Sequence, residues 1–371
     1  MNEKFFDVYF DYGESKIRAA AFKKGNLKNF FFTESRFYSD NSFASNEIEK
    51  IVSSLEKDTN EYLNDINIMV DSSQMLPISI SITKKFDQKK LENHKIQFLI
   101  QDAKQQILNN YSSQNIIHII ILRYRINDIE YFVLPDDVEC ERLSIDILFI
   151  CLPKKYTDNI KKLFSKFDIS INNILCSSYA KSLNYKNNFE KSENLLFVDM
   201  GFNKTSMIFY NNNNFISFDV LPIGGNHITK DISKILKINL EEAEKIKLNF
   251  DKDENFLKEK KLSIELVQRI IFSRIEEILE LSTKALHLKN NLNEKLRLKI
   301  ILMGEGAKIL DNKFKEKISF SKEINLLDES ANEICESGFK LRNDYNKQEV
   351  VLIPKTLKKV GFFEKFFHLF R

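Results

Sequence analysis

The chain has 371 residues, of which 43% are hydrophobic and 29% charged, a composition typical of a globular protein with room for two domains. Its 56 basic and 53 acidic residues leave a net charge of +3, so no nucleic-acid partner is expected. The four cysteines lack Cys-x-x-Cys spacing, and no apolar run reaches the ~18 residues that a spanning helix needs. Together with the absence of a signal peptide pattern, these features favour a cytoplasmic protein.

The first predicted unit is a β-hairpin over Phe5–Phe22. An apolar strand ends at Asp11, Gly13 permits a tight turn, and Ser15 and Lys16 offer donors at the start of the next strand. Such a turn can wrap its amides around a phosphate, while the carboxylate reaches a bound cation through water. Taken alone, the same residues also suit an ordinary hairpin turn.

The chain then completes a first α/β domain and leaves it for an insertion. A helix over 46–60 and a strand over 66–70 continue the first domain. From Ser79 the pattern predicts a compact α/β subdomain: a short strand, a helix over 88–108, strands at 117–124, 128–133 and 142–152, and a helix over 156–167. A strand at 169–175 leads back, and 176–183 forms a helix that crosses to a second domain.

A second hairpin, Leu195–Phe209, repeats the plan of the first about half the chain away. Asp199 ends a buried strand, Gly201 allows the turn, and Asn203, Lys204 and Thr205 supply donors. An internal repeat of one supersecondary unit predicts two similar domains that face each other across a nucleotide cleft. No Walker sequence competes with this interpretation.

Three further features follow the second hairpin. Gly224 and Gly225 sit between a strand over 215–222 and a helix over 226–236, where free amides suit either phosphate or a plain loop. On the next helix, 240–248, Glu244 and Lys247 share a face, as many solvated surface pairs do. After a long helix over 264–288, a buried strand over 298–303 runs into a Gly-x-Gly turn and a predicted helix, a common place for adenine or ribose; the turn is Gly304, Glu305 and Gly306.

The chain ends in an amphipathic segment. Residues 345–355 are polar and predict a linker. At about 100° per residue, the apolar side chains of 356–371 share one arc, which suits either an interfacial membrane helix or a helix packed on protein. The side chains expected to bind anionic lipid are Phe362, Phe363, Phe366, Phe367, Leu369 and Phe370, with Lys358 and Lys359 beside them.

The order of these elements resembles the superfamily of actin, the heat-shock chaperone ATPases and the sugar kinases, and within it the FtsA family of bacterial cell division proteins. The likeness is carried by Asp11–Ile17, Glu141–Asp146, Val198–Gly201, Leu221–Ile232 with Glu241–Lys247, Arg274–Leu281 and Gly304–Gly306. The resemblance implies an α/β fold of the actin-like ATPase type, with two domains, an inserted FtsA-type subdomain and a C-terminal amphipathic helix.

The domain boundaries expected from the resemblance divide the chain into six parts. They are 1–78 with 159–185 (first actin-like domain), 79–158 (inserted subdomain), 186–228 with 298–340 (second actin-like domain), 229–297 (its subdomain), 341–355 (linker) and 356–371 (membrane-targeting helix).

The resemblance also implies roles for the cleft residues. Asp11 and Asp199 would flank Mg²⁺, and Gly224 and Gly225 would join the two hairpins around the phosphates of ATP. Glu244 and Lys247 would approach ribose and adenine, and the Gly-x-Gly turn would line the base.

The sequence departs from the family at two places in the cleft. Phe202 and Asn203 stand where the family has glycines, and Cys176-Ser177 stands where an acidic residue and a proline usually begin the crossing helix. Without that carboxylate, no evident group orients an attacking water, so no catalytic residue is assigned and slow or absent ATP hydrolysis is expected.

By resemblance, the chain would form actin-like filaments and tether the FtsZ ring to the cytoplasmic face of the inner membrane at the division site, together with other division proteins. The FtsZ C-terminal tail would dock on roughly 229–297. Two alternatives remain. A PilM-like platform protein of type IV pili would bind a partner's short N-terminal peptide near the insertion and lack a lipid-binding tail, and a phosphotransferase would need a cleft carboxylate and a second-substrate pocket.

Overall fold

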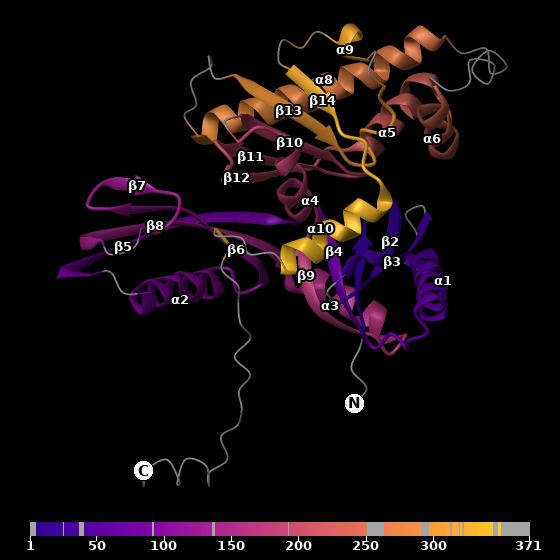
Figure 1. Ribbon diagram of the computed structural model, residues 1–371. Helices are drawn as coiled ribbons and strands as arrows, with labels where there is room; N and C mark the ends of the chain where they lie inside the picture. The colour runs from indigo at the N-terminus through magenta and orange to yellow at the C-terminus, as the bar shows by residue number, and fades with distance from the viewer. Residues whose placement is uncertain are drawn as a thin grey trace.

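The computed structural model describes residues 5–349 apart from 25, 37–40, 91–92, 136–137, 192, 251–262, 291–296, 312–313, 319, 321–322 and 344–347. In this part the chain forms three sheets (Figure 1). Two five-stranded sheets belong to two halves stacked one above the other, and a four-stranded sheet extends to one side. The predicted membrane segment, 356–371, lies outside the described residues.

The first half is built on the sheet β3-β2-β1-β4-β9. Its strands are β1 (Phe6–Tyr12), β2 (Lys16–Lys23), β3 (Asn26–Arg36), β4 (Asp65–Val70) and β9 (Ser170–Cys176). The first three pair antiparallel, and β4 and β9 continue in parallel. Helices α1 (Asn41–Thr59) and α3 (Lys154–Ser165) contribute Ile48, Leu55, Ile160 and Phe164 to its core. The predicted hairpin, the helix over 46–60 and the strands over 66–70 and 169–175 are confirmed.

The second half repeats this topology in the sheet β12-β11-β10-β13-β14. Its strands are β10 (Asn194–Met200), β11 (Thr205–Asn211), β12 (Asn214–Leu221), β13 (Leu298–Met303) and β14 (Glu323–Leu326). Again a three-stranded antiparallel meander is followed by two parallel strands. The internal repeat inferred from the two Asp-x-Gly hairpins is therefore confirmed.

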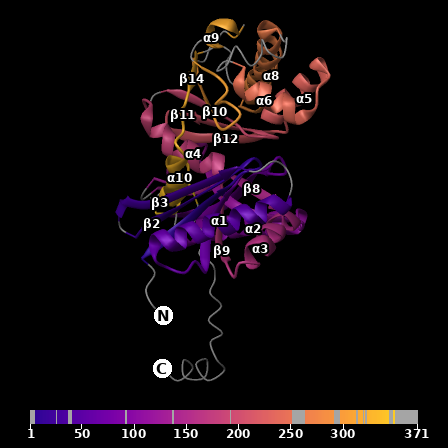
Figure 2. The same ribbon diagram turned by 90° about the vertical axis from the view of Figure 1, so that its right-hand side faces the viewer.

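Helices cover one face of the second sheet, away from the first half (Figure 2). They are α5 (Gly225–Leu236), α6 (Leu240–Asn249) and α8 (Ile264–Asn290), close to their predicted bounds, with the short α9 (Phe314–Lys317) nearby. The helix predicted directly after Gly306 is wrong. The backbone there forms turns, because the amide of Gly306 donates to Met200 and that of Ala307 donates to Gly304.

The inserted subdomain is the sheet β5-β8-β6-β7 with one helix. It comprises β5 (Leu76–Lys90), α2 (Asn93–Asn110), β6 (Gln114–Ile126), β7 (Ile129–Tyr131) and β8 (Glu139–Pro153). The predicted strands are confirmed, except that the first, expected to be short, is 15 residues long. The helix predicted here over 156–167 is α3, which packs in the core of the first half instead. The helix predicted from Gln88 begins later, because β5 continues through Lys90 to pair with β8. Leu99, Ala103 and Phe149 belong to the separate core of this subdomain.

Two helices lie between the halves: the crossing helix α4 (Ser177–Tyr185), followed by the 3-10 turn η1 (Lys186–Asn188), and α10 (Ala331–Asn343) (Figure 2). Tyr179 of α4 is fully buried against Phe215 of the second sheet. Phe339 of α10 packs on Tyr9 and Phe22 of the first sheet. The expected boundary at 340 placed this helix in the second domain, so that assignment is corrected for 331–340.

The linker predicted over 341–355 also needs correction. Residues 341–343 complete α10, and Gln348 is buried between the insertion and the second half. Its side-chain amide donates to the carbonyls of Ile121 and Phe215, and it accepts from the amide of Phe215. Glu349 bridges β6 and lies 2.7 Å from His118 Nδ1. Polar residues predicted a solvated linker here because their hydrogen-bond partners are remote in sequence.

Candidate functional site

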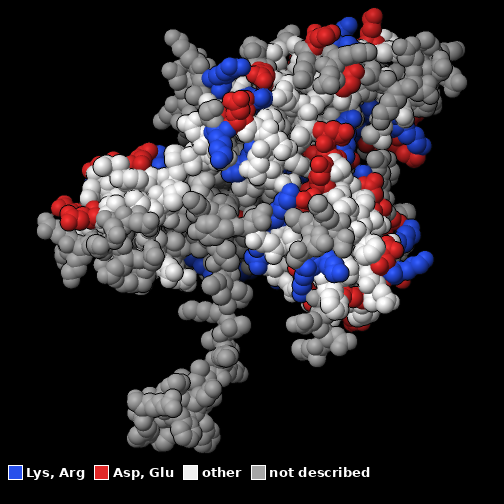
Figure 3. Space-filling view, viewed as in Figure 1, with Lys and Arg blue, Asp and Glu red and all other residues white. Residues whose placement is uncertain are grey.

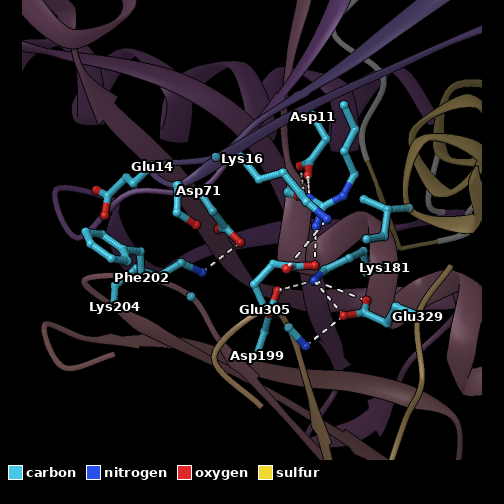
Figure 4. Close-up of a pocket in the computed structure, with 17 residues that line it drawn as sticks. Asp11, Glu14, Lys16, Asp71, Lys181, Asp199, Phe202, Lys204, Glu305 and Glu329 are labelled. Atoms are coloured by element: carbon cyan, nitrogen blue, oxygen red, sulfur yellow. Dashed lines mark hydrogen bonds and ion pairs between the residues drawn. The ribbon is translucent and has the colours of Figure 1, made fainter. Parts of the chain in front are cut away.

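Two adjoining cavities lie between the halves, with empty volumes of about 550 and 580 Å³. The first is lined by both hairpin turns and by the crossing helix (Figure 4). The second is lined by α6 and by the turn after β13. They share Ser15, Lys16, Gly201, Phe202 and Glu305. Polar groups from both halves converge on these cavities, as they do in small-ligand sites.

In the first hairpin, strand register brings a carboxylate and a cation together. Asp11 on β1 is the direct cross-strand partner of Arg18 on β2, so their side chains share one face of the sheet. Arg18 NH1 lies 2.7 Å from Asp11 Oδ2, and Ser177 Oγ donates to Asp11 Oδ1 at 2.7 Å. Both Asp11 oxygens are therefore engaged. Arg18 is 3% exposed.

The second hairpin closes with the same backbone bond as the first. The amide of Gly201 donates to the carbonyl of Lys204 at 2.8 Å, as Gly13 donates to Lys16 at 3.0 Å. The Lys204 side chain crosses to the first half, where Nζ lies 2.7 Å from Asp71 Oδ2 just beyond β4. Burial raises the pKa of Asp71, which Lys204 opposes. This ion pair ties one half to the other.

The second aspartate also faces a buried cation. Lys181 Nζ on α4 lies 2.8 Å from Asp199 Oδ2 and 3.2 Å from Glu329 Oε1 (Figure 4). Burial alone would raise the pKa of Asp199, but the charges of Lys181 and Lys204 bring it below its ordinary value. Burial likewise opposes protonation of Lys181, yet its two carboxylate partners raise its pKa. Glu329 also accepts from the amide of Gly304 at 2.7 Å.

Glu305, in the turn after β13, joins the halves from the other side. It contacts Arg18 of the first half, and Lys308 Nζ lies 2.8 Å away. Burial acts to raise the pKa of Glu305, but Arg18 and Lys308 outweigh it and lower the pKa from 4.5 to about 2. The ionised carboxylate is thus favoured in the folded protein.

This shift predicts an acid-sensitive contribution to stability. Because the folded pKa lies below the unfolded one, Glu305 stabilises the fold fully above pH 4.5, and the contribution is lost as pH falls toward about 2. Its size at neutral pH is about 3 kcal/mol. Urea unfolding of the wild type and Glu305→Gln at several pH values should show a gap that narrows below pH 4.5. A gap that stays constant with pH would contradict the assignment.

The second cavity contains the pair Glu244 and Lys247, which is buried rather than solvated. Lys247 is 4% exposed, and its Nζ lies 2.6 Å from Glu244 Oε2. It also donates to Thr229 Oγ1 at 2.9 Å and to the carbonyl of Gly225 at 3.2 Å. Burial lowers the pKa of Lys247, which Glu244 opposes. A buried pair beside an open cavity can present both an acceptor and a donor to a ligand.

Most of the predicted site residues come together here. The first cavity is lined by Asp11, Gly13, Ser15, Lys16, Asp199, Gly201, Gly304 and Glu305, and the second adds Gly225, Glu244, Lys247 and Gly306. Three others do not line either cavity. Thr205 is buried and donates to the carbonyl of Ile223, Asn203 accepts from Asn226, and Gly224 packs against the backbone of the second hairpin.

Five charged residues that line the first cavity had no role predicted from the sequence: Glu14, Arg18, Asp71, Lys181 and Glu329. Asp71 could have been predicted, because it directly follows a buried strand. Asp11 and Asp199 likewise lie near the ends of buried strands. Lys181 was also detectable as a lysine within a crossing helix whose neighbours Tyr179 and Ala180 are apolar. Glu329 lies in a loop, and only the tertiary fold brings it to Gly304.

The chemistry of this donor set does not suit a divalent metal between Asp11 and Asp199. Both carboxylates already face buried cations, Arg18 and Lys181. Two unit charges of like sign about 4 Å apart repel by about 4 kcal/mol at an effective dielectric constant of about 20, and a divalent ion doubles this. Within the described residues, no cluster of three or more His, Cys, Asp or Glu is arranged as a metal site.

The cleft also holds a carboxylate at the start of the crossing helix, but it is fully bonded. Asp71 Oδ2 accepts from the Ser178 amide at 3.1 Å and meets Lys204, while Oδ1 accepts from the Ser178 hydroxyl at 3.1 Å. Burial raises the pKa of the neighbouring Cys176 thiol, which therefore stays neutral. Neither group is poised to take a proton from water.

Comparison with known proteins shows what this chain is similar to. A family model described as cell division protein FtsA matches residues 196–318. The cell division protein FtsA of Buchnera aphidicola (subsp. Acyrthosiphon pisum) is 24% identical over 364 residues, covering 87% of this chain and 85% of that protein. The similarity to this FtsA therefore extends over most of both chains. The Bacillus subtilis FtsA is 25% identical over 215 residues, covering 53% of this chain and 48% of that protein.

The comparison with solved structures concerns the fold. The structure of the PilM–PilN type IV pilus biogenesis complex matches with a TM-score of 0.59 at 12% identity, covering 88% of this chain and 89% of that chain. At this identity the match establishes the fold alone, which is that of the actin-like ATPases. The fold class expected from the sequence is confirmed. No helix in the described ranges of the chain combines the length and apolar character needed to cross a bilayer.

Proposed function

We propose that this chain is an actin-like cell division protein that polymerises and tethers the FtsZ ring to the cytoplasmic face of the inner membrane. The observation that carries the proposal is the similarity to FtsA across 87% of this chain and 85% of that relative. The repeated sheets and the inserted β5-β8-β6-β7 subdomain agree with it. Membrane attachment rests on the amphipathic pattern of residues 356–371.

The same proposal assigns ATP to the paired cavities. The hairpin turns, with Gly13, Ser15, Lys16 and Gly201, would receive the phosphates, and the second cavity would receive ribose and adenine. Polar groups from both halves line the two cavities, and Gly225 leaves space where a Cβ would approach Gly306 Cα at 3.5 Å. Slow or absent hydrolysis follows from the fully bonded Asp71 and the neutral Cys176.

The FtsZ tail would dock on the subdomain over 229–297, which includes α5, α6 and α8. Arg274 of α8 holds Asp231 of α5 through two hydrogen bonds of 2.8 and 3.0 Å, which fixes these helices against each other. A rigid pair of helices gives a peptide a preformed surface and reduces the entropy cost of binding. Filament formation and contacts with other division proteins are part of the same proposal.

The FtsZ assignment is testable in solution. A labelled peptide of the cognate FtsZ C-terminal tail should raise its fluorescence anisotropy on binding to the full chain, whereas a scrambled peptide should not. Lys230→Glu on the exposed face of α5 should weaken binding by about tenfold, while the matched exposed Lys161→Glu on α3 should leave it unchanged. Equal effects of the two changes would contradict docking on this subdomain.

The alternative is a PilM-like platform protein, favoured by the structural match to a PilM–PilN complex. It predicts capture of a partner's N-terminal peptide near the insertion and no attachment to lipid. The sequence similarity favours FtsA, because the matching family model and several relatives are cell division protein FtsA.

A further inference from the structure

Two basic side chains of the cleft lie beside Asp11 and Asp199, the two aspartates predicted to flank a metal ion. Arg18 and Lys181 are 3% and 5% exposed, and each lies within 2.8 Å of one of the two aspartates. The charge of Asp11 also helps to raise the pKa of Lys181, and the charge of Arg18 helps to lower the pKa of Asp199. The two cations therefore lie close to both carboxylates. The arrangement is a built feature of the cleft rather than a surface ion pair.

Regular structure holds both cations in position. Arg18 lies on β2 in register with Asp11, and Lys181 lies on the buried crossing helix α4. Lys181 is further fixed by Glu329, which the amide of Gly304 holds at 2.7 Å. Because these contacts come from several separate segments, moving a single loop would not remove both cations. A metal would have to displace them against the surrounding fold.

Two other cations stand at the hairpin turns, where phosphates would lie. Lys16 Nζ is 3.0 Å from Glu34, whose side chain is 39% exposed, so exchanging this partner for a phosphate costs little. Lys204 stands at the equivalent position of the second hairpin and faces Asp71. With Arg18 and Lys181, four basic side chains line one cavity.

We propose that the cleft binds a nucleoside polyphosphate without magnesium, with the fixed charges of Arg18 and Lys181 in place of the ion. This inference rests on the proposed nucleotide site and replaces its expected metal requirement. The two cations neutralise the charges of Asp11 and Asp199, so that these two aspartates do not repel the phosphates. Lys16 and Lys204 then supply the donors that a bound metal would otherwise supplement.

The test measures binding of a fluorescent ATP analogue to the full chain, once with EDTA and once with Mg²⁺, at matched ionic strength. The expected dissociation constants agree within about twofold. A tightening by more than about tenfold with Mg²⁺ overturns the inference and leaves the nucleotide site in place. Failure to bind in either condition overturns both this inference and the nucleotide part of the proposed function.

A double substitution tests the role of Lys181 separately. Lys181→Ala combined with Glu329→Gln removes the cation and one of its two carboxylate partners, which limits the uncompensated charge left in the core. Its affinity in EDTA should fall by about tenfold, and Mg²⁺ should restore much of it. Lys245→Ala, an exposed lysine on α6, is the matched control and should behave as the wild type. Loss in EDTA without recovery in Mg²⁺ would overturn the role given to Lys181.

Discussion

Removal of residues 357–371 should abolish binding of the chain to vesicles of phosphatidylglycerol and phosphatidylethanolamine. Five phenylalanines and a leucine share one arc of the terminal segment, with lysines just before it. Partition of such a face into the headgroup region is the main source of affinity, so the shortened chain should pellet at the level of a protein without lipid contact. Co-sedimentation of the full chain and the chain ending at Thr356 measures the difference.

Point substitutions test whether vesicle binding needs the apolar face of the terminal segment or only the presence of that segment. Phe363→Asp with Phe366→Asp charges the apolar arc and should reduce vesicle binding by more than about tenfold. Glu364→Gln with His368→Asn alters only the opposite face and serves as the matched control. Equal binding by all forms would mean that the segment packs on protein, and the PilM-like alternative would then gain support.

Substitution of Gly304 by alanine should destabilise the protein by about 3–5 kcal/mol. Gly304 has φ of +94°, which strains any residue with a side chain, and an added Cβ would overlap Asp199 Oδ1 and lie 2.5 Å from the carbonyl of Met200. The substitution would also displace the amide that holds Glu329. Urea unfolding measures the loss.

Gly225→Ala is the matched control for this prediction. Its Cβ would have no neighbour closer than 3.5 Å, and the residue opens helix α5, where alanine is favourable. Its free energy of unfolding should stay within about 1 kcal/mol of the wild type. Similar losses from the two substitutions would show that the turn after β13 tolerates a side chain.

The sequence predicted local features well, because each left a local pattern. Asp11 and Asp199 end apolar strands beside a turn glycine, and the structure places both hairpins at one cleft. The strands of the inserted subdomain were predicted from the change of pattern that begins at Ser79. Even the crossing helix was predicted within two residues at each end.

What the sequence did not predict depends on contacts between distant segments. Nothing near Lys181 indicates that Asp199 and Glu329 will surround it, and the polar Gln348 looks solvated until Ile121 and Phe215 are seen beside it. The strand β5 also runs into residues with helical spacing, because pairing with β8 outweighs their local preference. On the face shown in Figure 3, acidic and basic side chains of the described residues are interspersed, which fits the balanced composition.

The most direct test of the tether is recruitment of the cognate FtsZ to anionic vesicles, followed by fluorescence of labelled FtsZ on the vesicle surface. With the full chain present, FtsZ should coat the vesicles. It should stay in solution when the chain ends at Thr356 or when FtsZ lacks its C-terminal tail. FtsZ that remains in solution with the full chain and intact tail would contradict the account.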